Sequence, residues 1–159
     1  MKEQLLTKSL LDAWHSHVSR TDKLLDKLTD EQLQQQVSPG RNSGVYLLGH
    51  LAAVHDRMSP LLGIGERKYP HLDEPFLTNP DKAIKEIPSV AELRNNWKTV
   101  NTELENQFKN MQPADWFERH TSVSEEDFAK EPHRNKLSVL VSRTTHLAGH
   151  LGQMIFLER

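Results

Sequence analysis

Two histidines near the end of the chain, His146 and His150, have a spacing that could let both bind one metal ion. They lie in a segment, residues 135–159, whose apolar side chains recur at helical intervals. In a helix, residues four apart are one turn apart and about 40° from each other around the axis. Both imidazoles can therefore face one ion, as in helix-borne zinc sites. The alternative is a core pair without a metal, because nine histidines in 159 residues also produce such a pair by chance.

A metal site needs a third donor, and His50 is the candidate that the sequence favours. The predicted helix over residues 44–62 surrounds His50 with apolar residues, so its imidazole should be partly buried. A buried imidazole without a partner is energetically costly. His55 lies about 140° away on the same helix, so the two cannot face one centre. Gly49 leaves room for another helix or a ligand to approach closely.

Four long amphipathic helices must position these residues. Their apolar residues recur at helical spacing, and no segment has a convincing strand pattern. Ser43, Ser89 and Asn135 are expected to cap three of them, and Ser89 with Glu92 fits a capping box. The predicted helices are residues 2–28, 44–62, 89–111 and 135–159. This pattern predicts an all-α fold, a four-helix bundle.

Two long connections, residues 66–88 and 112–134, join the predicted helices. Both contain prolines, and their length predicts at least one crossover from one end of the bundle to the other. In the first connection, residues 81–86 could form one helical turn. The second contains His120 and His133, which are candidates for an additional metal ligand, although a loop histidine is more often a surface residue.

Composition narrows the function. A length of 159 residues favours a single domain, residues 1–159. The net charge of −2 and the scattered basic residues indicate no nucleic-acid partner. No apolar run approaches the roughly 20 residues of a membrane span, and no secretory signal is visible, which favours a cytoplasmic protein. The chain contains no cysteine, so a metal must use other ligands and any thiol must come with the substrate.

Three neutral imidazoles from His50, His146 and His150 would leave a coordination position of a divalent ion open. The site would keep the full charge of the ion and favour hydroxide, thiolate or carboxylate as a further ligand. The ion could lower the pKa of a bound nucleophile or polarise a carbonyl. Zinc, nickel, iron and manganese all accept imidazole, so ligand type does not select one. Three polar residues near the histidines in sequence could hydrogen-bond to the ligand rings: Arg143, Thr145 and Gln153. Their spacing alone does not assign this role to any of them.

Two motifs, Leu48-Gly49-His50-Leu51 and His146-x-x-x-His150-x-Gly152-Gln153, resemble those of the DinB-like family of bacterial four-helix bundles. The loop of residues 38–43, Ser89-x-x-Glu92 with Trp97, and Asp115-Trp116 follow in the family order. The resemblance covers essentially the whole chain. In this family three histidines bind a divalent metal, often zinc or nickel. The resemblance implies that role for His50, His146 and His150.

Some members of the family are S-transferases that use bacillithiol, mycothiol or glutathione, or mycothiol-dependent isomerases, and others have no assigned activity. The resemblance therefore implies a metal-dependent enzyme for a small-molecule substrate, either a transferase that activates a low-molecular-weight thiol or a hydrolase. Many members are homodimers, so a homodimer is expected. Two positions depart from the family, Leu147 where glutamate is common and Leu151 where arginine is common. The alternatives are a non-catalytic bundle with a structural ion or bound ligand, and a metal-free protein whose histidines bond to each other.

Overall fold

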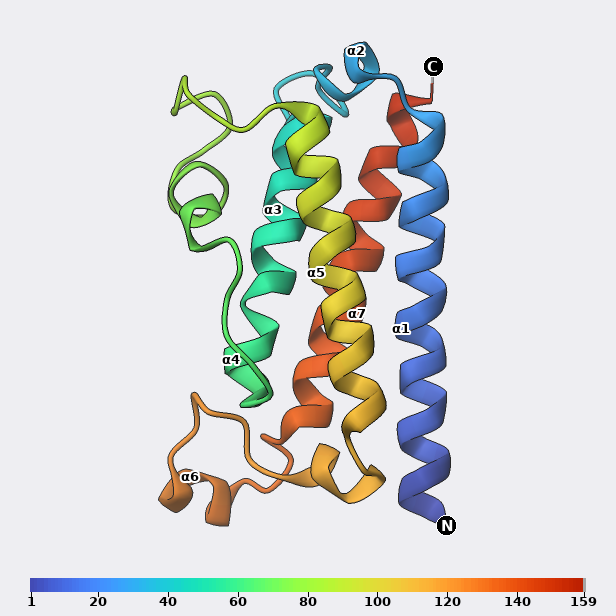
Figure 1. Cartoon of the computed structure of the whole chain (residues 1–159), viewed down its shortest axis with the longest axis vertical. Coiled ribbons are helices and arrows are strands. Elements are labelled where there is room, and N and C mark those ends of the chain that lie inside the picture. Colours follow the sequence, from blue (N-terminus) through green and yellow to red (C-terminus); the bar gives the residue numbers. More distant parts are fainter. Residues whose placement is uncertain (159) are drawn as a thin grey trace.

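A computed structural model describes residues 1–158, and this part of the chain is helical with no β-strand (Figure 1). The all-α prediction is confirmed. The four longest helices lie side by side and are α1 (Lys2–Lys27), α3 (Gly44–Asp56), α5 (Val90–Asn110) and α7 (Lys136–Met154). The shorter helices are α2 (Asp30–Leu33), α4 (Met58–Leu62), η1 (Pro70–Leu72), η2 (Glu74–Thr78), η3 (Pro113–Phe117), α6 (Glu125–Lys130) and η4 (Ile155–Leu157).

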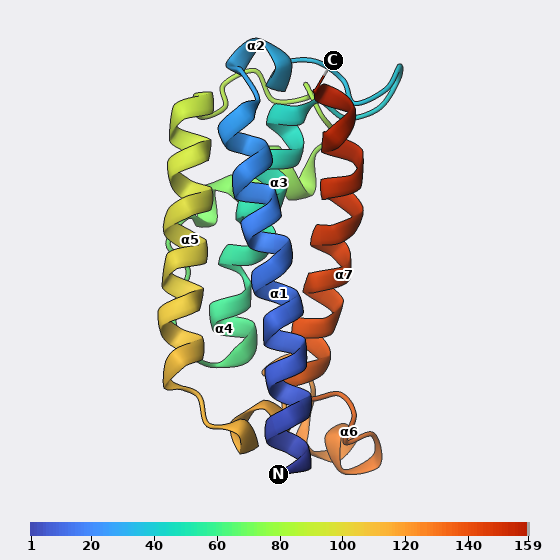
Figure 2. The same ribbon diagram turned by 90° about the vertical axis from the view of Figure 1, so that its right-hand side faces the viewer.

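The long helices do not simply alternate in direction. In Figures 1 and 2, α1 and α7 run towards one end of the bundle, and α3 and α5 run towards the other. Residues 63–89 return along the outside of α3 before α5 begins, which is the predicted crossover. Residues 111–135 stay at one end and carry Trp116, which is buried against Phe108. This topology places α3 and α7, the two helices with the candidate histidines, close together in the bundle.

The helix starts follow the sequence signals. The side chain of Ser43 accepts a hydrogen bond from the backbone of Tyr46 at the start of α3. Ser89 and Glu92 form the predicted reciprocal capping box at the start of α5. Asn135 accepts a hydrogen bond from a backbone N–H in the first turn of α7. Each cap satisfies an N–H group that has no partner within its helix.

The helix predicted over residues 44–62 is interrupted at Arg57, so α3 and α4 are separate elements. The cause is Pro60, which has no N–H to donate to the carbonyl of Asp56 and whose ring crowds that carbonyl. The neighbouring hydrogen bonds persist, from Arg57 N to Ala53 O and from Leu61 N to Arg57 O, both at 3.2 Å. The interruption is therefore local, and α4 continues the path of α3 (Figure 1).

The helical turn predicted at residues 81–86 is wrong, because Lys82 has a left-handed backbone with φ of 67°. The crossover instead forms η1 and η2, each with a proline in its first turn. A proline there loses no helical hydrogen bond, because the first N–H groups of a helix have no acceptor within it. Two of the four prolines of this segment, Pro70 and Pro75, thus mark the starts of short helices.

Two adjoining groups of apolar side chains form the core. One group includes Leu48, Leu51, Phe76 and Leu147, and the other contains Trp14 together with the side chains at the opposite end of the bundle. Phe76 belongs to the crossover, so this segment contributes to the core as well as covering it. None of the described helices is both long enough and apolar enough to cross a bilayer.

Candidate metal centre

The imidazoles of His50, His146 and His150 converge, as the sequence predicts. The Nε2 atom of His146 lies 3.0 Å from Nε2 of His50 and 3.1 Å from Nε2 of His150. One ligand atom from each residue lies within 4.8 Å of the other two. All three side chains are partly exposed, so a ligand from solvent can reach them.

The ring of His50 is oriented by the crossover. Its Nδ1 lies 2.9 Å from the carbonyl oxygen of Phe76. Because a carbonyl oxygen can only accept a hydrogen bond, Nδ1 carries the proton and Nε2 has a free lone pair. Phe76 is the middle residue of the π-helix η2, which is so short that its later carbonyl groups have no donor within the helix. The contact therefore satisfies a free carbonyl group and fixes the tautomer of His50.

His150 is oriented in the same way by its own helix. Its Nδ1 lies 2.8 Å from Oε1 of Gln153, one turn further along α7. The Nδ1 proton is donated to this oxygen, which leaves the lone pair of Nε2 facing His50 and His146. Gln153 is one of the neighbouring polar residues whose role the sequence left open. Two of the three rings thus direct unprotonated nitrogens towards a common centre.

His146 lies between the other two histidines, and its Nδ1 is buried with no hydrogen-bond partner among the described residues. Burial lowers the pKa of His146 to about 4, with further lowering from His150, His50 and Arg143. Burial also lowers the pKa of His50, against the opposing effect of the Phe76 carbonyl. Both rings are therefore neutral at pH 7, as a metal ligand must be.

The three rings fit a metal ion better than they fit one another. His146 Nε2 carries at most one hydrogen, so it cannot donate to both His50 and His150 at once. At least one contact near 3 Å then joins two lone pairs, unless a cation lies among the nitrogens. Two nitrogens bonded to one ion at ~2.0–2.1 Å, with bond angles between tetrahedral and octahedral values, lie about 2.9–3.4 Å apart. The observed separations of 3.0 and 3.1 Å agree with this range.

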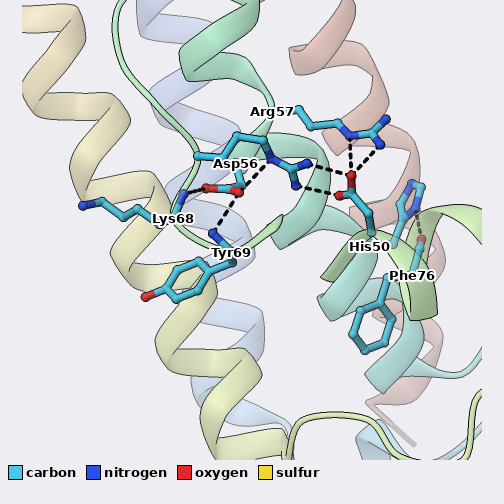
Figure 3. Close-up of polar contacts among 8 residues, drawn as sticks. His50, Asp56, Arg57, Lys68, Tyr69 and Phe76 are labelled. Atoms are coloured by element: carbon cyan, nitrogen blue, oxygen red, sulfur yellow. Dashed lines mark hydrogen bonds and ion pairs between the residues drawn. The ribbon is translucent and has the colours of Figure 1, made fainter. Parts of the chain in front are cut away.

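An ion-pair network anchors the crossover that orients His50 (Figure 3). Asp56, at the end of α3, accepts hydrogen bonds from the backbone of residues 68–69 at 2.8 and 3.0 Å and from Arg67 at 3.1 Å. Asp73 accepts from both Arg57 and Arg67 at 2.6 Å. These bonds tie the crossover to α3 before it reaches η2. Sequence reasoning missed this support, because neither acidic residue lies in a recognisable motif.

Gly49 permits the close approach between α3 and the crossover. A β-carbon at this position would lie 2.6 Å from atoms of the Phe76 ring, which is 1% exposed and cannot move aside. The close approach predicted at Gly49 is therefore present, and the neighbour is Phe76. The glycine lets Phe76 reach the position from which its carbonyl binds His50.

Replacing Gly49 with alanine is expected to destabilise the protein by roughly 1–3 kcal/mol, because the added methyl group overpacks the contact with Phe76. Urea unfolding at pH 7 would measure this. Gly152→Ala is the matched control, since a β-carbon on this α7 residue would meet nothing within 4 Å and should stabilise the helix by ~0.5–1 kcal/mol. Similar effects of the two substitutions would show that Phe76 tolerates the methyl group.

The other histidines lie outside this group. His55 is completely buried and bonds to Asn101 at 2.8 Å, in agreement with the prediction that it and His50 face different centres. His120 bonds to Ser122 at 3.0 Å, and His133 is exposed. Among the described residues, the candidate metal group contains neither of these two loop histidines.

The fold and the three imidazoles define this protein as a helical bundle with a candidate metal centre built from facing helices. Comparison with protein families assigns the chain to a superfamily. The sequence profile of the DinB superfamily matches residues 13–154, and the chain belongs to this superfamily.

A solved structure described as the conserved protein of locus from Enterococcus faecalis is similar to this chain, with a TM-score of 0.66 and 15% sequence identity. The match covers 95% of this chain and 94% of that chain. At this identity the similarity shows a shared fold. No match to the chain was found among curated proteins.

Proposed function

We propose that the protein is a divalent-metal-dependent enzyme, most specifically a transferase that activates a low-molecular-weight thiol. The observation that carries this proposal is the convergence of the Nε2 atoms of His50, His146 and His150, at 3.0 and 3.1 Å for the two closest pairs. Zinc or nickel is the expected ion, and iron or manganese would also accept this ligand set.

The chain's own residues hold and orient the site. The Phe76 carbonyl and the Gln153 side chain bind the Nδ1 protons of His50 and His150, so both rings present free lone pairs. His146 completes the group from the turn of α7 that precedes His150. A bound divalent ion with three neutral ligands supplies an open coordination position that lowers the pKa of a bound thiol or water.

The ligand set favours an enzyme over a closed structural site. Structural zinc sites usually complete four ligands from the protein, and often use cysteine. The chain has no cysteine, and among the described residues the candidate group contains no carboxylate. A position thus remains for a ligand from solution, and a thiolate would balance part of the charge. A homodimer completes the proposal and rests on family resemblance.

The test is consumption of a small thiol in the presence of a generic electrophile. Protein loaded with zinc or nickel is expected to accelerate the reaction of glutathione or bacillithiol with 1-chloro-2,4-dinitrobenzene. His150→Ala should reduce the rate to that of the metal-free protein. His133→Ala is the control, because it removes an exposed histidine of the loop before α7.

Two other outcomes are informative. Equal rates for the loaded wild type and His150→Ala would reject the transferase proposal. If a stoichiometric ion binds and its removal lowers the melting temperature without any turnover, the non-catalytic alternative with a structural ion holds. A search for hydrolysis of small esters with the same variants would separate the hydrolase from the transferase.

A further inference from the structure

Arg143 lies one turn before His146 on α7, about 60° from it around the helix axis. Its side chain is half-buried, and its Nε is buried with no hydrogen-bond partner. Its positive charge lowers the pKa of both His50 and His146, in agreement with its place one turn before His146 on the same helix. An arginine in this position normally bonds to a carboxylate or a carbonyl. Arg143 forms no ion pair with any described residue.

The charges around Arg143 do not supply a counterion. The carboxylates of Asp56 and Asp73 are bonded to Arg57 and Arg67. Burial and the positive charge of Arg57 both lower the pKa of Arg143. The guanidinium therefore lies in surroundings that disfavour its charge unless an anion is bound. A divalent ion on the neighbouring histidines would increase this positive potential.

A hollow of about 260 Å³ opens beside Arg143, between α7, α4 and the loop that precedes α6. It is lined by Leu61, His120, Ser122, Ser138, Val139 and Ser142 in addition to Arg143. No carboxylate lines it. The Ser138 hydroxyl already donates to the Asn135 carbonyl and the Ser122 hydroxyl is bonded to His120, so the charged donor of the hollow is Arg143. Its volume is below the roughly 300–1,000 Å³ of sites that hold drug-sized ligands. The hollow suits a small charged group, and its one permanent charge is positive.

We propose that Arg143 binds an anionic group, a carboxylate or a phosphate, of the small molecule whose reacting end lies at the three histidines. The planar guanidinium offers paired N–H donors that match the two oxygens of either group. This inference rests on the proposed function, because it gives that site a class of substrate. It makes Arg143 a residue that selects the substrate.

The experiment uses the full-length protein loaded with Co²⁺, and the same protein without metal, and titrates each with inorganic phosphate and with acetate. Calorimetry measures the affinity, and the visible absorption of Co²⁺ reports changes next to the ion. Arg143→Gln is expected to weaken anion binding by about tenfold to a hundredfold, the usual effect of losing a charged hydrogen bond. Arg143→Lys should retain part of the affinity, because the charge remains without the paired donors.

The control is Arg20→Gln, which removes an exposed arginine of α1 and should leave anion binding unchanged. Binding of phosphate alone, or of acetate alone, assigns the substrate group to that chemistry, and either result supports the proposal. Equal affinities in wild type and Arg143→Gln, or no binding of either anion by the wild type, would overturn it. Metal content is measured separately for each variant. Anion binding that depends on Arg143 in a protein that takes up no metal would support the anion site while rejecting the metal-dependent function.

Discussion

Replacing His146 with alanine is expected to weaken the affinity for zinc or nickel by more than about a hundredfold, since losing a residue that merely supports a ligand already costs ten- to a hundredfold. His146 is the common neighbour in the site, with its Nε2 at 3.0 Å from His50 and 3.1 Å from His150. Removing it leaves two donors on different helices. The remaining pair cannot surround an ion as three donors do.

Competition with a chromophoric chelator would measure the affinity, and elemental analysis would give the stoichiometry. His133→Ala serves as the control here too, because it removes an exposed imidazole. An unchanged affinity in His146→Ala would mean that any bound ion lies elsewhere in the chain. Loss of metal from both variants alike would point to non-specific binding by histidines.

The second large effect concerns acid stability and arises from His55. This side chain is 0% exposed, and its ring lies 4.7 Å from that of Trp14 and 4.9 Å from that of Trp97. Its Nδ1 donates to the Oδ1 of Asn101, whose amide nitrogen is bonded to the Trp97 carbonyl. Its Nε2 is buried without a partner in the described part of the chain. Burial, the largest cause, lowers the pKa of His55 from its usual 6.5 to about 3.

A lowered pKa in the folded state means that the unfolded chain binds a proton more readily. The contribution of His55 to stability is therefore complete above pH 6.5 and is lost as the pH falls towards 3. The expected loss is about 1.4 kcal/mol for each pH unit below the unfolded pKa. Over the whole interval the loss is about 5 kcal/mol, which equals the lower end of the stability of a typical domain, ~5–15 kcal/mol. We expect the free energy of unfolding to fall steeply within this interval.

Urea unfolding of the metal-free protein at several pH values between 7 and 4 would test this expectation. His55→Gln is the comparison, since an amide can still donate to Asn101 but does not titrate. Its free energy of unfolding should depend less on pH than that of the wild type. The difference in slope should approach the value for one proton taken up on unfolding. The lowered pKa values of His50 and His146 act equally in both proteins. Parallel pH dependences would show that His55 is not the group responsible.

Much of the fold follows from local signals in the sequence. Ser43, Ser89 and Asn135 act as caps because each places a side-chain oxygen before an apolar helical pattern. The helical spacing of His146 and His150 predicted their common direction, and the apolar neighbours of His50 predicted that it is partly buried. The convergence of these residues followed from the bundle itself, because facing helices direct inward side chains to one centre.

The parts that sequence reasoning missed depend on contacts between distant segments. The Phe76 carbonyl is a backbone group, so no residue type reveals that it orients His50. Its availability follows from the π-helix η2, which forms where the sequence predicted only an irregular connection. The break at Arg57 has a local cause, because Pro60 lacks the N–H group that would bond to the carbonyl four residues earlier. The pairing of Asp73 with Arg57 and Arg67 joins the crossover to α3, and no local motif reveals it.

The two contributing helices are far apart along the chain, since His50 and His146 are separated by 96 positions. During synthesis, a ribosome must therefore release α7 before the site can exist, and a shortened translation product would lack it entirely. An ion bound there would also close a very long loop, and such closures restrict the unfolded ensemble most strongly. Metal supply in the cell would then act on newly completed chains, as a late step that holds α3 and α7 together.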